Sequence, residues 1–320
     1  MTLKEIAEDA EVSIRTVRRV LNGEAHVRPD KAKRVRKSLE SSPYVPNLLA
    51  RGLRNKRTGI VGVIADSLGI EVFTKKLSAL QFEADKRGIS TMLALTAGSQ
   101  ERELKFCAEY ARFCDGIVFL NSPSASSVLL LSESETRFVV ADGKAPESNV
   151  VRIDRSSGVD QAFDEIGAFY ESYVFLAGDL STVDARRSAF ERNTQIVSSE
   201  KTMRIACGNA GGKGGFMAYS KVASMPRPLV FCYNDRIAAG LLRALHENEV
   251  DDPRLFGIIG FDNDNFTEYT HKRISTITQS VDDLAEKTLD LLDCLINERK
   301  VERTSFAMTR FINRETTLGE

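Results

Sequence analysis

The feature that most constrains the fold is the regular alternation, from Ile60 onward, of short β-branched runs with segments of helical periodicity. This alternation is typical of βα units around parallel sheets. The predicted strands are Ile60–Ala65, Thr91–Leu95, Gly116–Leu120, Phe138–Ala141, Tyr173–Ala177, Arg204–Ala206, Leu229–Cys232 and Phe256–Gly260. Predicted helices between them include Lys75–Arg87, Asp235–Glu247 and Asp282–Arg299. Eight or more units are too many for one doubly wound sheet of this length. We therefore expect two α/β lobes with a ligand cleft between them.

The first 45 residues show a different pattern, that of short amphipathic helices. Apolar side chains recur at helical spacing over Leu3–Ala10 and again over Val17–Leu21. Between these runs Glu11-Val12-Ser13 forms a tight turn, Ser13 suits an N-cap, and Asn22-Gly23 ends the second helix. Two short helices joined in this way indicate a helix-turn-helix. A third helix is predicted from Asp30 to about Ser41, with its apolar face inward and its basic face suited to a phosphate backbone. The residues expected to face inward are Ala32, Val35 and Leu39.

The outer face of the second helix is rich in arginine. It carries Ile14, Arg15, Arg18 and Arg19. The planar fork of arginine can bond guanine O6 and N7 together, which is worth about 1–3 kcal/mol of base discrimination. We expect Arg15 and Arg19 to read bases because they lie four apart near the entering end of the helix. For Arg18 a solvated or phosphate-contacting role is an equal alternative.

The distribution of charge supports a nucleic-acid-binding head. The whole chain has a net charge of −1, but residues 1–57 carry 14 Lys/Arg against 7 Asp/Glu, and the remaining 263 residues carry 30 against 38. A head of +7 on a body of −8 indicates that one end meets a polyanion.

At this point the sequence resembles a known family. TLKEIAEDAEVSIRTVRRVLNGEAHV, followed by YVPNLLARGLRNKRTGIVGVI, is similar to the headpiece, hinge and first sensor strand of the LacI/GalR family of bacterial transcription regulators. The resemblance implies DNA contacts at Ser13, Ile14, Arg15, Thr16, Arg18, Arg19, Asn22 and His26. In the family the first three residues of the recognition helix and one later arginine read bases. The positions that correspond to Asn22 and His26 face phosphates.

Two departures from the family occur in the head. The turn usually contains glycine where this chain has Glu11, and a non-glycine residue with positive φ costs about 1–2 kcal/mol. The third helix lacks the usual serine at its start, so we expect Asp30 to cap it instead.

The segment 46–57 is too short and too weakly helical to be stable alone. The resemblance implies that it becomes helical on the operator, where two copies pair in the minor groove and a leucine from each wedges the central base step. That leucine corresponds to Leu53, and Ala50 would allow the close pairing. Asn47 and Arg54 complete the contacts predicted for this hinge. An apolar wedge is an established way to kink DNA.

The resemblance continues through the body, in AGDLSTVDARRSAF, YNDRIAAGLLRAL, GIIGFDNDNF, STITQS and FINRETTL. It implies a fold shared with periplasmic sugar-binding proteins and a small effector, most simply a sugar or sugar derivative. The residues carried over as ligand contacts are Phe73, Asp142, Arg186, Asn234, Asp262 and Gln279. Asn234 and Asp262 have an alternative role as strand-end caps or turn residues, and Arg187 is an alternative to Arg186. Ala210 stands in a glycine-rich stretch where many sugar-binding members have an aromatic residue.

These observations predict an α/β protein with an all-α helix-turn-helix headpiece at residues 1–45, a hinge at 46–57 and a sensor core at 58–320. The core divides into an N-lobe of about 58–153 plus 280–305 and a C-lobe of about 154–279 plus 306–320. The predicted function is that of a dimeric transcriptional repressor on a palindromic operator, because one short helix reads only a few base pairs. The alternative is a solute-binding protein of the periplasmic type without a transcription role.

Other classes of function find little support. Gly211-Gly212-Lys213-Gly214 lacks the spacing of a phosphate loop, the three histidines are far apart in sequence, and no calcium loop or nucleophile motif is complete. The five cysteines are scattered, so no metal, cofactor or disulfide is expected. The charged, helix-patterned N-terminus and the absence of a long apolar run favour a cytoplasmic protein without catalytic activity.

Overall fold

The computed structural model describes residues 2–21, 27–42, 57–145, 149–181, 184–197, 201–300 and 305–319. The chain divides into two compact units, Met1–Thr58 and Gly59–Glu320.

The first unit is a small helical domain formed by α1 (Leu3–Asp9), α2 (Ile14–Leu21) and α3 (Pro29–Glu40). The first helix begins with a capping box, in which the Thr2 hydroxyl accepts from the Glu5 amide and the Glu5 carboxylate accepts from the Thr2 amide. One apolar cluster joins the three helices. Its fully buried members are Ile6, Ala7, Ala10, Val17 and Val35. The predicted helix-turn-helix core is confirmed at these positions, and Leu39 packs against it from the side.

The turn between the first two helices has the strain that the sequence predicted. Glu11 has φ of +51°, and its carboxylate forms an ion pair of 3.0 Å with Arg34. Ser13 caps the second helix as expected, since its hydroxyl accepts from the Thr16 amide at 3.2 Å. The prediction for Asp30 is wrong. Arg28 occupies the N-cap position of α3 without a side-chain cap, and Asp30 lies within the first turn. Pro29 explains the difference, because its fixed φ and missing N–H favour the first helical position.

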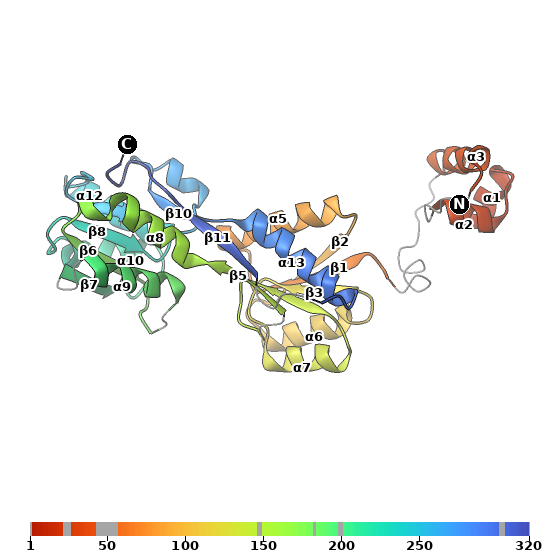
Figure 1. The fold of residues 1–320 in the computed structure, drawn as a ribbon, viewed down its shortest axis with the longest axis horizontal. Helices are drawn as coiled ribbons and strands as arrows, with labels where there is room; N and C mark the ends of the chain where they lie inside the picture. Colours follow the sequence, from red (N-terminus) through yellow and green to blue (C-terminus); the bar gives the residue numbers. More distant parts are fainter. Residues whose placement is uncertain are drawn as a thin grey trace. The chain divides into compact units, whose positions relative to one another are not determined.

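The second unit contains two sheets. The larger has seven strands in the order β10-β11-β5-β4-β3-β1-β2, of which only the β10–β11 pair is antiparallel. Its strands are β1 (Ile60–Ala65), β2 (Ser90–Leu95), β3 (Gly116–Phe119), β4 (Phe138–Ala141), β5 (Val150–Asp154), β10 (Thr276–Gln279) and β11 (Ser305–Ile312). Two helices, α5 (Glu71–Lys86) and α13 (Val281–Ile296), pack side by side on one face (Figure 1). The other face is covered by α6 (Gln100–Tyr110) and α7 (Ala125–Glu133).

The smaller sheet is fully parallel, in the order β7-β6-β8-β9. Its strands are β6 (Ser172–Ala177), β7 (Thr202–Ala206), β8 (Pro228–Cys232) and β9 (Gly257–Ile259). On one face, α8 (Arg155–Ile166) and α9 (Ala185–Val197) enclose a core rich in phenylalanine. On the other face lie α10 (Gly212–Met217), α11 (Tyr219–Val222) and α12 (Asp235–Glu247). The predicted two-lobed α/β architecture is therefore confirmed.

The chain crosses between the lobes where β5 leads into α8, where β10 leads into α13, and within β11. The first half of β11 pairs with β5 and the second half pairs with β10. The predicted lobe boundary at residues 305 and 306 thus falls inside this strand. The sequence patterns pointed to the other strands but not to β5, β10 and β11 as regular elements, because these strands are short or carry polar residues at the crossing.

The glycine-rich stretch serves close helix packing. A Cβ on Gly215 would lie 1.9 Å from the Ile237 carbonyl oxygen, and one on Gly240 would lie 1.8 Å from the Gly212 oxygen. Only glycine therefore allows α10 to approach α12 so closely. All five cysteines are free thiols. Within the part of the chain that the structure describes, no helix is long and apolar enough to cross a bilayer.

Candidate functional site

The helical unit presents the predicted DNA-reading face on α2. Val17 is fully buried on the inner side of this helix, whereas Ile14, Arg15 and Arg18 are exposed on the outer side and Arg19 is partly exposed. Basic side chains are thus held outward by an apolar anchor on the opposite side of the same helix. The hydroxyls of Ser13 and Thr16 hydrogen-bond to each other at 3.0 Å. The remaining predicted DNA contacts, Asn22, His26, Asn47, Ala50, Leu53 and Arg54, lie outside the described residues.

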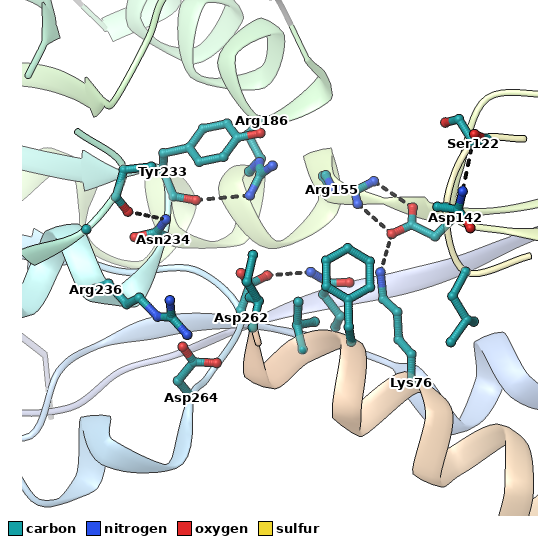
Figure 2. A pocket seen from close by; sticks show the side chains of 18 of the residues that line it. Lys76, Ser122, Asp142, Arg155, Arg186, Tyr233, Asn234, Arg236, Asp262 and Asp264 are labelled. Carbon is teal, nitrogen blue, oxygen red and sulfur yellow. Dashed lines mark hydrogen bonds and ion pairs between the residues drawn. The ribbon is translucent and has the colours of Figure 1, made fainter. Parts of the chain in front are cut away.

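The body contains a cavity of about 700 Å³ lined by residues of both lobes (Figure 2). All six residues predicted to contact a ligand line this one cavity. They are Phe73, Asp142, Arg186, Asn234, Asp262 and Gln279. Arg187, the alternative to Arg186, is not among the lining residues and instead binds the Glu191 carboxylate at 2.9 Å. The structure therefore brings together positions that are far apart in the sequence.

Asp142 is the centre of a buried ion cluster. It follows β4 with φ of +64°, and its side chain is 4% exposed. Arg155, at the start of α8, donates to both of its carboxylate oxygens at 2.8 and 2.5 Å, and Lys76 of α5 donates to Oδ2. The Ile153 amide donates to Oδ1 at 3.3 Å. The four acceptor positions of this carboxylate are thus occupied by protein donors.

The charges in this cluster shift one another's pKa values, against the effect of burial. Burial acts to raise the pKa of Asp142, but Lys76 and Arg155 outweigh it, and the pKa lies below its usual value. For Lys76 burial is the larger effect, and its pKa is lowered although Asp142 opposes this. A carboxylate and two cations leave the cluster with an excess of positive charge facing the cavity.

Arg186 is fixed on the opposite wall of the cavity. Its guanidinium carbon lies 3.7 Å from the centre of the Tyr233 ring and 4.8 Å from that of Phe261. Its Nε donates to Asp184 at 2.7 Å and its Nη1 donates to the Tyr233 carbonyl at 3.0 Å. The planar group is therefore held in one orientation beside the cavity, facing Arg155 in Figure 2.

Asn234 and Asp262 both have local structural roles, as predicted by the alternative interpretation of them as cap or turn residues. Asn234 caps α12 by accepting from the Ile237 amide at 2.9 Å, and its amide nitrogen donates to the Ala210 carbonyl at 3.0 Å. Asp262 adopts φ of +97° after β9, and its Oδ1 accepts from the Gln279 side chain. Both residues still line the cavity, so capping and ligand contact are compatible at these positions.

Two further buried carboxylates, Asp235 and Asp264, lie close to each other near the cavity. Asp235 is fully buried at the start of α12, where it accepts from the Thr276 hydroxyl at 2.6 Å and the Asp264 amide at 2.7 Å. Burial raises its pKa well above the usual value. Asp264 is 4% exposed, and burial together with the nearby Asp262 and Glu71 raises its pKa to about 6.

Four charged lining residues were missed by sequence reasoning: Lys76, Arg155, Arg236 and Asp264. Arg155 could have been predicted from the sequence, because it follows the largely apolar run Val150–Ile153 and the N-cap Asp154. Lys76 could not, since a lysine within an amphipathic helix normally faces solvent. Its side chain is nevertheless 4% exposed and pairs with the equally buried Asp142, which follows β4.

Comparisons with known proteins agree with this architecture. Residues 2–47 match the family model of bacterial regulatory proteins of the lacI family, and residues 159–317 match a periplasmic binding protein-like domain. Catabolite control protein A of Staphylococcus epidermidis is 26% identical over 314 residues, which cover 94% of each protein. That of Staphylococcus xylosus is 26% identical over 313 residues, again 94% of each.

Solved structures share the fold. The lac repressor dimer bound to operator and the anti-inducer ONPF aligns with a TM-score of 0.82 at 21% identity, over 100% of this chain and 99% of that one. The complex of the transcriptional regulator CelR with cellobiose aligns with a TM-score of 0.66 at 18% identity, over 99% of each chain. A LacI family regulator from Enterococcus faecium with bound ribose gives 0.68 at 21% identity, over 81% of this chain and 98% of that one.

Fold and sites together define a class of protein, in which one chain carries a helix-turn-helix head and a two-lobed domain of the periplasmic binding protein type. The chain carries a helix-turn-helix domain of the lacI family of bacterial regulatory proteins at residues 2–47 and a periplasmic binding protein-like domain at residues 159–317. It is a DNA-binding regulator of transcription.

Proposed function

We propose that this regulator is a repressor that binds a palindromic operator as a homodimer and that a small polar molecule in the cavity changes its affinity for DNA. The observation that carries the proposal is the presence, on one chain, of an outward arginine face on α2 and a polar cavity between two lobes. Two lobes around a ligand provide two arrangements whose populations the ligand shifts. The solved lac repressor dimer bound to operator and an anti-inducer supports this reading.

On the DNA side, Arg15 and Arg19 read bases and Arg18 contributes to either bases or phosphates. Ile14, Thr16 and Ser13 lie at the entering end of α2, where apolar and hydroxyl contacts to base edges are made. Asn22 and His26 contact phosphates, and the hinge residues Asn47, Ala50, Leu53 and Arg54 act in the minor groove. These assignments for the hinge rest on the family resemblance.

On the effector side, the cavity fits a molecule with many oxygen acceptors, which is a sugar or a sugar derivative. Asp142 has no acceptor position left, so it positions Lys76 and Arg155, and these cations meet the effector. Arg186 and Asp262 supply a fixed donor and an acceptor from the other lobe, while Phe73 offers an apolar surface.

Unsatisfied polar atoms around the cavity support a polar occupant. Among the described residues, buried atoms without a hydrogen-bond partner include Oδ1 of Asn121, Nε of Arg155, Oδ1 of Asp264 and Oε1 of Gln279. All four residues line the cavity. Buried polar groups normally find partners, and a hydroxyl-rich ligand or the water it replaces provides them here. The cellobiose and ribose complexes of related regulators agree with this chemistry.

Dimerisation is supported by an apolar sheet edge. The edge strand β2 exposes Met92, Leu93 and Leu95 to 40, 42 and 36%, and the neighbouring α5 exposes Phe82 to 63%. An apolar edge strand is an aggregation hazard unless another surface covers it. We assign this surface to the dimer contact of the sensor domain. We further place the protein in the cytoplasm, where the operator lies, and assign it no catalytic reaction.

The proposal is tested by selecting operators from random DNA and then measuring binding by fluorescence anisotropy. A panel of neutral sugars, sugar phosphates, sugar acids and nucleosides is screened for a change in operator affinity. The Arg186→Lys variant is compared with Arg187→Lys, its neighbour outside the cavity. We expect Arg186→Lys to bind operator normally but to lose the effector response, and Arg187→Lys to keep both. An equal loss in the two variants, or no response to any compound in the wild type, would contradict the effector role.

A further inference from the structure

Two of the histidines that appear isolated in the sequence meet on the surface of the smaller lobe, away from the cavity. His246 lies in the last turn of α12, and His271 lies in the loop between η4 (Asn265–Glu268) and β10. Asp251, in the segment that follows α12, stands between them. His246 and His271 are 25 positions apart in the sequence, but the fold brings the last turn of α12 next to the loop before β10.

The ring nitrogens of the two histidines converge on one carboxylate. Nδ1 of His246 lies 3.1 Å from Oδ2 of Asp251, and Nε2 of His271 lies 2.8 Å from the same oxygen. The ring centroids are 4.2 Å apart with a 38° tilt. One potential ligand atom from each of the three side chains lies within 4.8 Å of the others. In a tetrahedral zinc site with bonds near 2.0 Å, neighbouring ligand atoms lie about 3.3 Å apart, so small side-chain shifts are sufficient to admit an ion.

The types of side chain in this cluster favour a transition-metal ion. Neutral imidazole and ionised carboxylate are the forms of histidine and aspartate that bind metal. Two imidazoles and a carboxylate suit zinc and its neighbours in the first transition row.

Lys272 opposes the binding of a cation at this cluster. Its ammonium lies 3.7 Å from Oδ2 of Asp251 and donates to the Asp251 backbone carbonyl. The side chain is 31% exposed. A bound ion would displace this ammonium toward water, which lowers affinity but leaves the two histidines and the carboxylate in place. Replacement of Lys272 by methionine should therefore tighten metal binding.

We propose that His246, Asp251 and His271 bind a divalent transition-metal ion of the zinc type, with water completing the coordination. The ion would tie the segment after α12 to the loop before β10. That loop continues from Asp262 and Asp264, so the tie would stabilise the segment that supplies one wall of the cavity. This site does not depend on the effector proposal.

The test uses the full-length, untagged protein and Zn²⁺ in isothermal titration, with the His246→Gln/His271→Gln double variant. We expect one Zn²⁺ per chain, a loss of affinity of roughly tenfold or more in the double variant, and wild-type binding in Glu247→Gln. Glu247 is the matched control because it neighbours His246 but pairs with Arg243 instead. Unchanged Zn²⁺ affinity in the double variant would overturn the proposal.

A second measurement distinguishes this site from the thiols. Co²⁺ bound by two imidazoles and a carboxylate shows visible d–d bands, whereas a thiolate ligand adds an intense near-ultraviolet charge-transfer band. We expect the visible bands alone in the wild type and their loss in the double variant. Charge-transfer absorption that persists in the double variant would assign the metal to cysteine and refute the histidine site.

Discussion

Replacement of Asp142 by asparagine tests the buried ion cluster most sharply. Asp142 and Lys76 are each 4% exposed, and Arg155 is 22% exposed. Asn keeps the size of the side chain but leaves two cations without their carboxylate. Removal of one partner from a buried pair costs about 3–5 kcal/mol, so we expect Asp142→Asn to lower the free energy of unfolding of the sensor domain by that amount. The assay is urea unfolding followed by far-ultraviolet circular dichroism, since the chain has no tryptophan.

The pH dependence of this variant has a defined sign. The pKa of Lys76 already lies below its usual value because of burial, and the loss of Asp142 lowers it further. A lysine with a lowered folded-state pKa binds fewer protons in the folded than in the unfolded chain, so stability rises with pH between that pKa and the ordinary value of about 10.4. The deficit of Asp142→Asn should therefore shrink as the pH rises.

A double variant provides the control. Lys76→Met in the Asp142→Asn background removes one unpaired charge while filling the space of the lysine stem. We expect it to restore most of the lost stability. A cost below about 1 kcal/mol for Asp142→Asn, or no recovery in the double variant, would refute the reasoning that the cluster is electrostatically coupled.

Three further substitutions, in the hinge, in α2 and beside the cavity, have defined expected outcomes. Leu53→Gly should abolish tight operator binding and leave weak, salt-sensitive DNA binding, as measured by anisotropy at two salt concentrations; unchanged operator affinity would exclude the wedge. Arg19→Ala should relax specificity at one symmetric pair of operator positions, and a uniform loss over all sequences would show that it touches only phosphate. Because the pKa of Asp264 is raised to about 6, this group should contribute a loss of at most about 3 kcal/mol of stability as the pH rises from 4 to 6, in addition to the loss that Asp235 contributes. Asp264→Asn should make the decline in urea unfolding smaller by that amount, and a decline equal to that of the wild type would contradict the role of Asp264.

The architecture was accessible from the sequence because apolar periodicity reports which side of an element is buried. The run Phe138–Ala141 and the helix Asp235–Glu247 have the bounds that their patterns predicted. The predicted cap at Asp30 was wrong for a physical reason. A proline at the first helical position is itself a signal for the start of a helix, and it can take the place of a side-chain cap. The family resemblance, rather than periodicity, placed the six cavity residues.

The electrostatics of the site were less accessible. Lys76 and Arg155 acquire their role through Asp142, and nothing local in the sequence records which cation meets which carboxylate. The same is true of His246 and His271, whose proximity depends on how the last turn of α12 packs beside the loop before β10. Pairings of this kind are products of tertiary packing, so they emerge only when the lobes are assembled.

The most direct test of the central claim is the enrichment of sequences from random duplex DNA by the purified full-length protein. We expect a palindrome to be enriched, to be bound by two chains, and to be preferred over bulk genomic DNA by a factor of at least about 10³. Equal affinity for selected and genomic DNA, with every effector candidate added in turn, would contradict the assignment of this chain as a sequence-specific regulator.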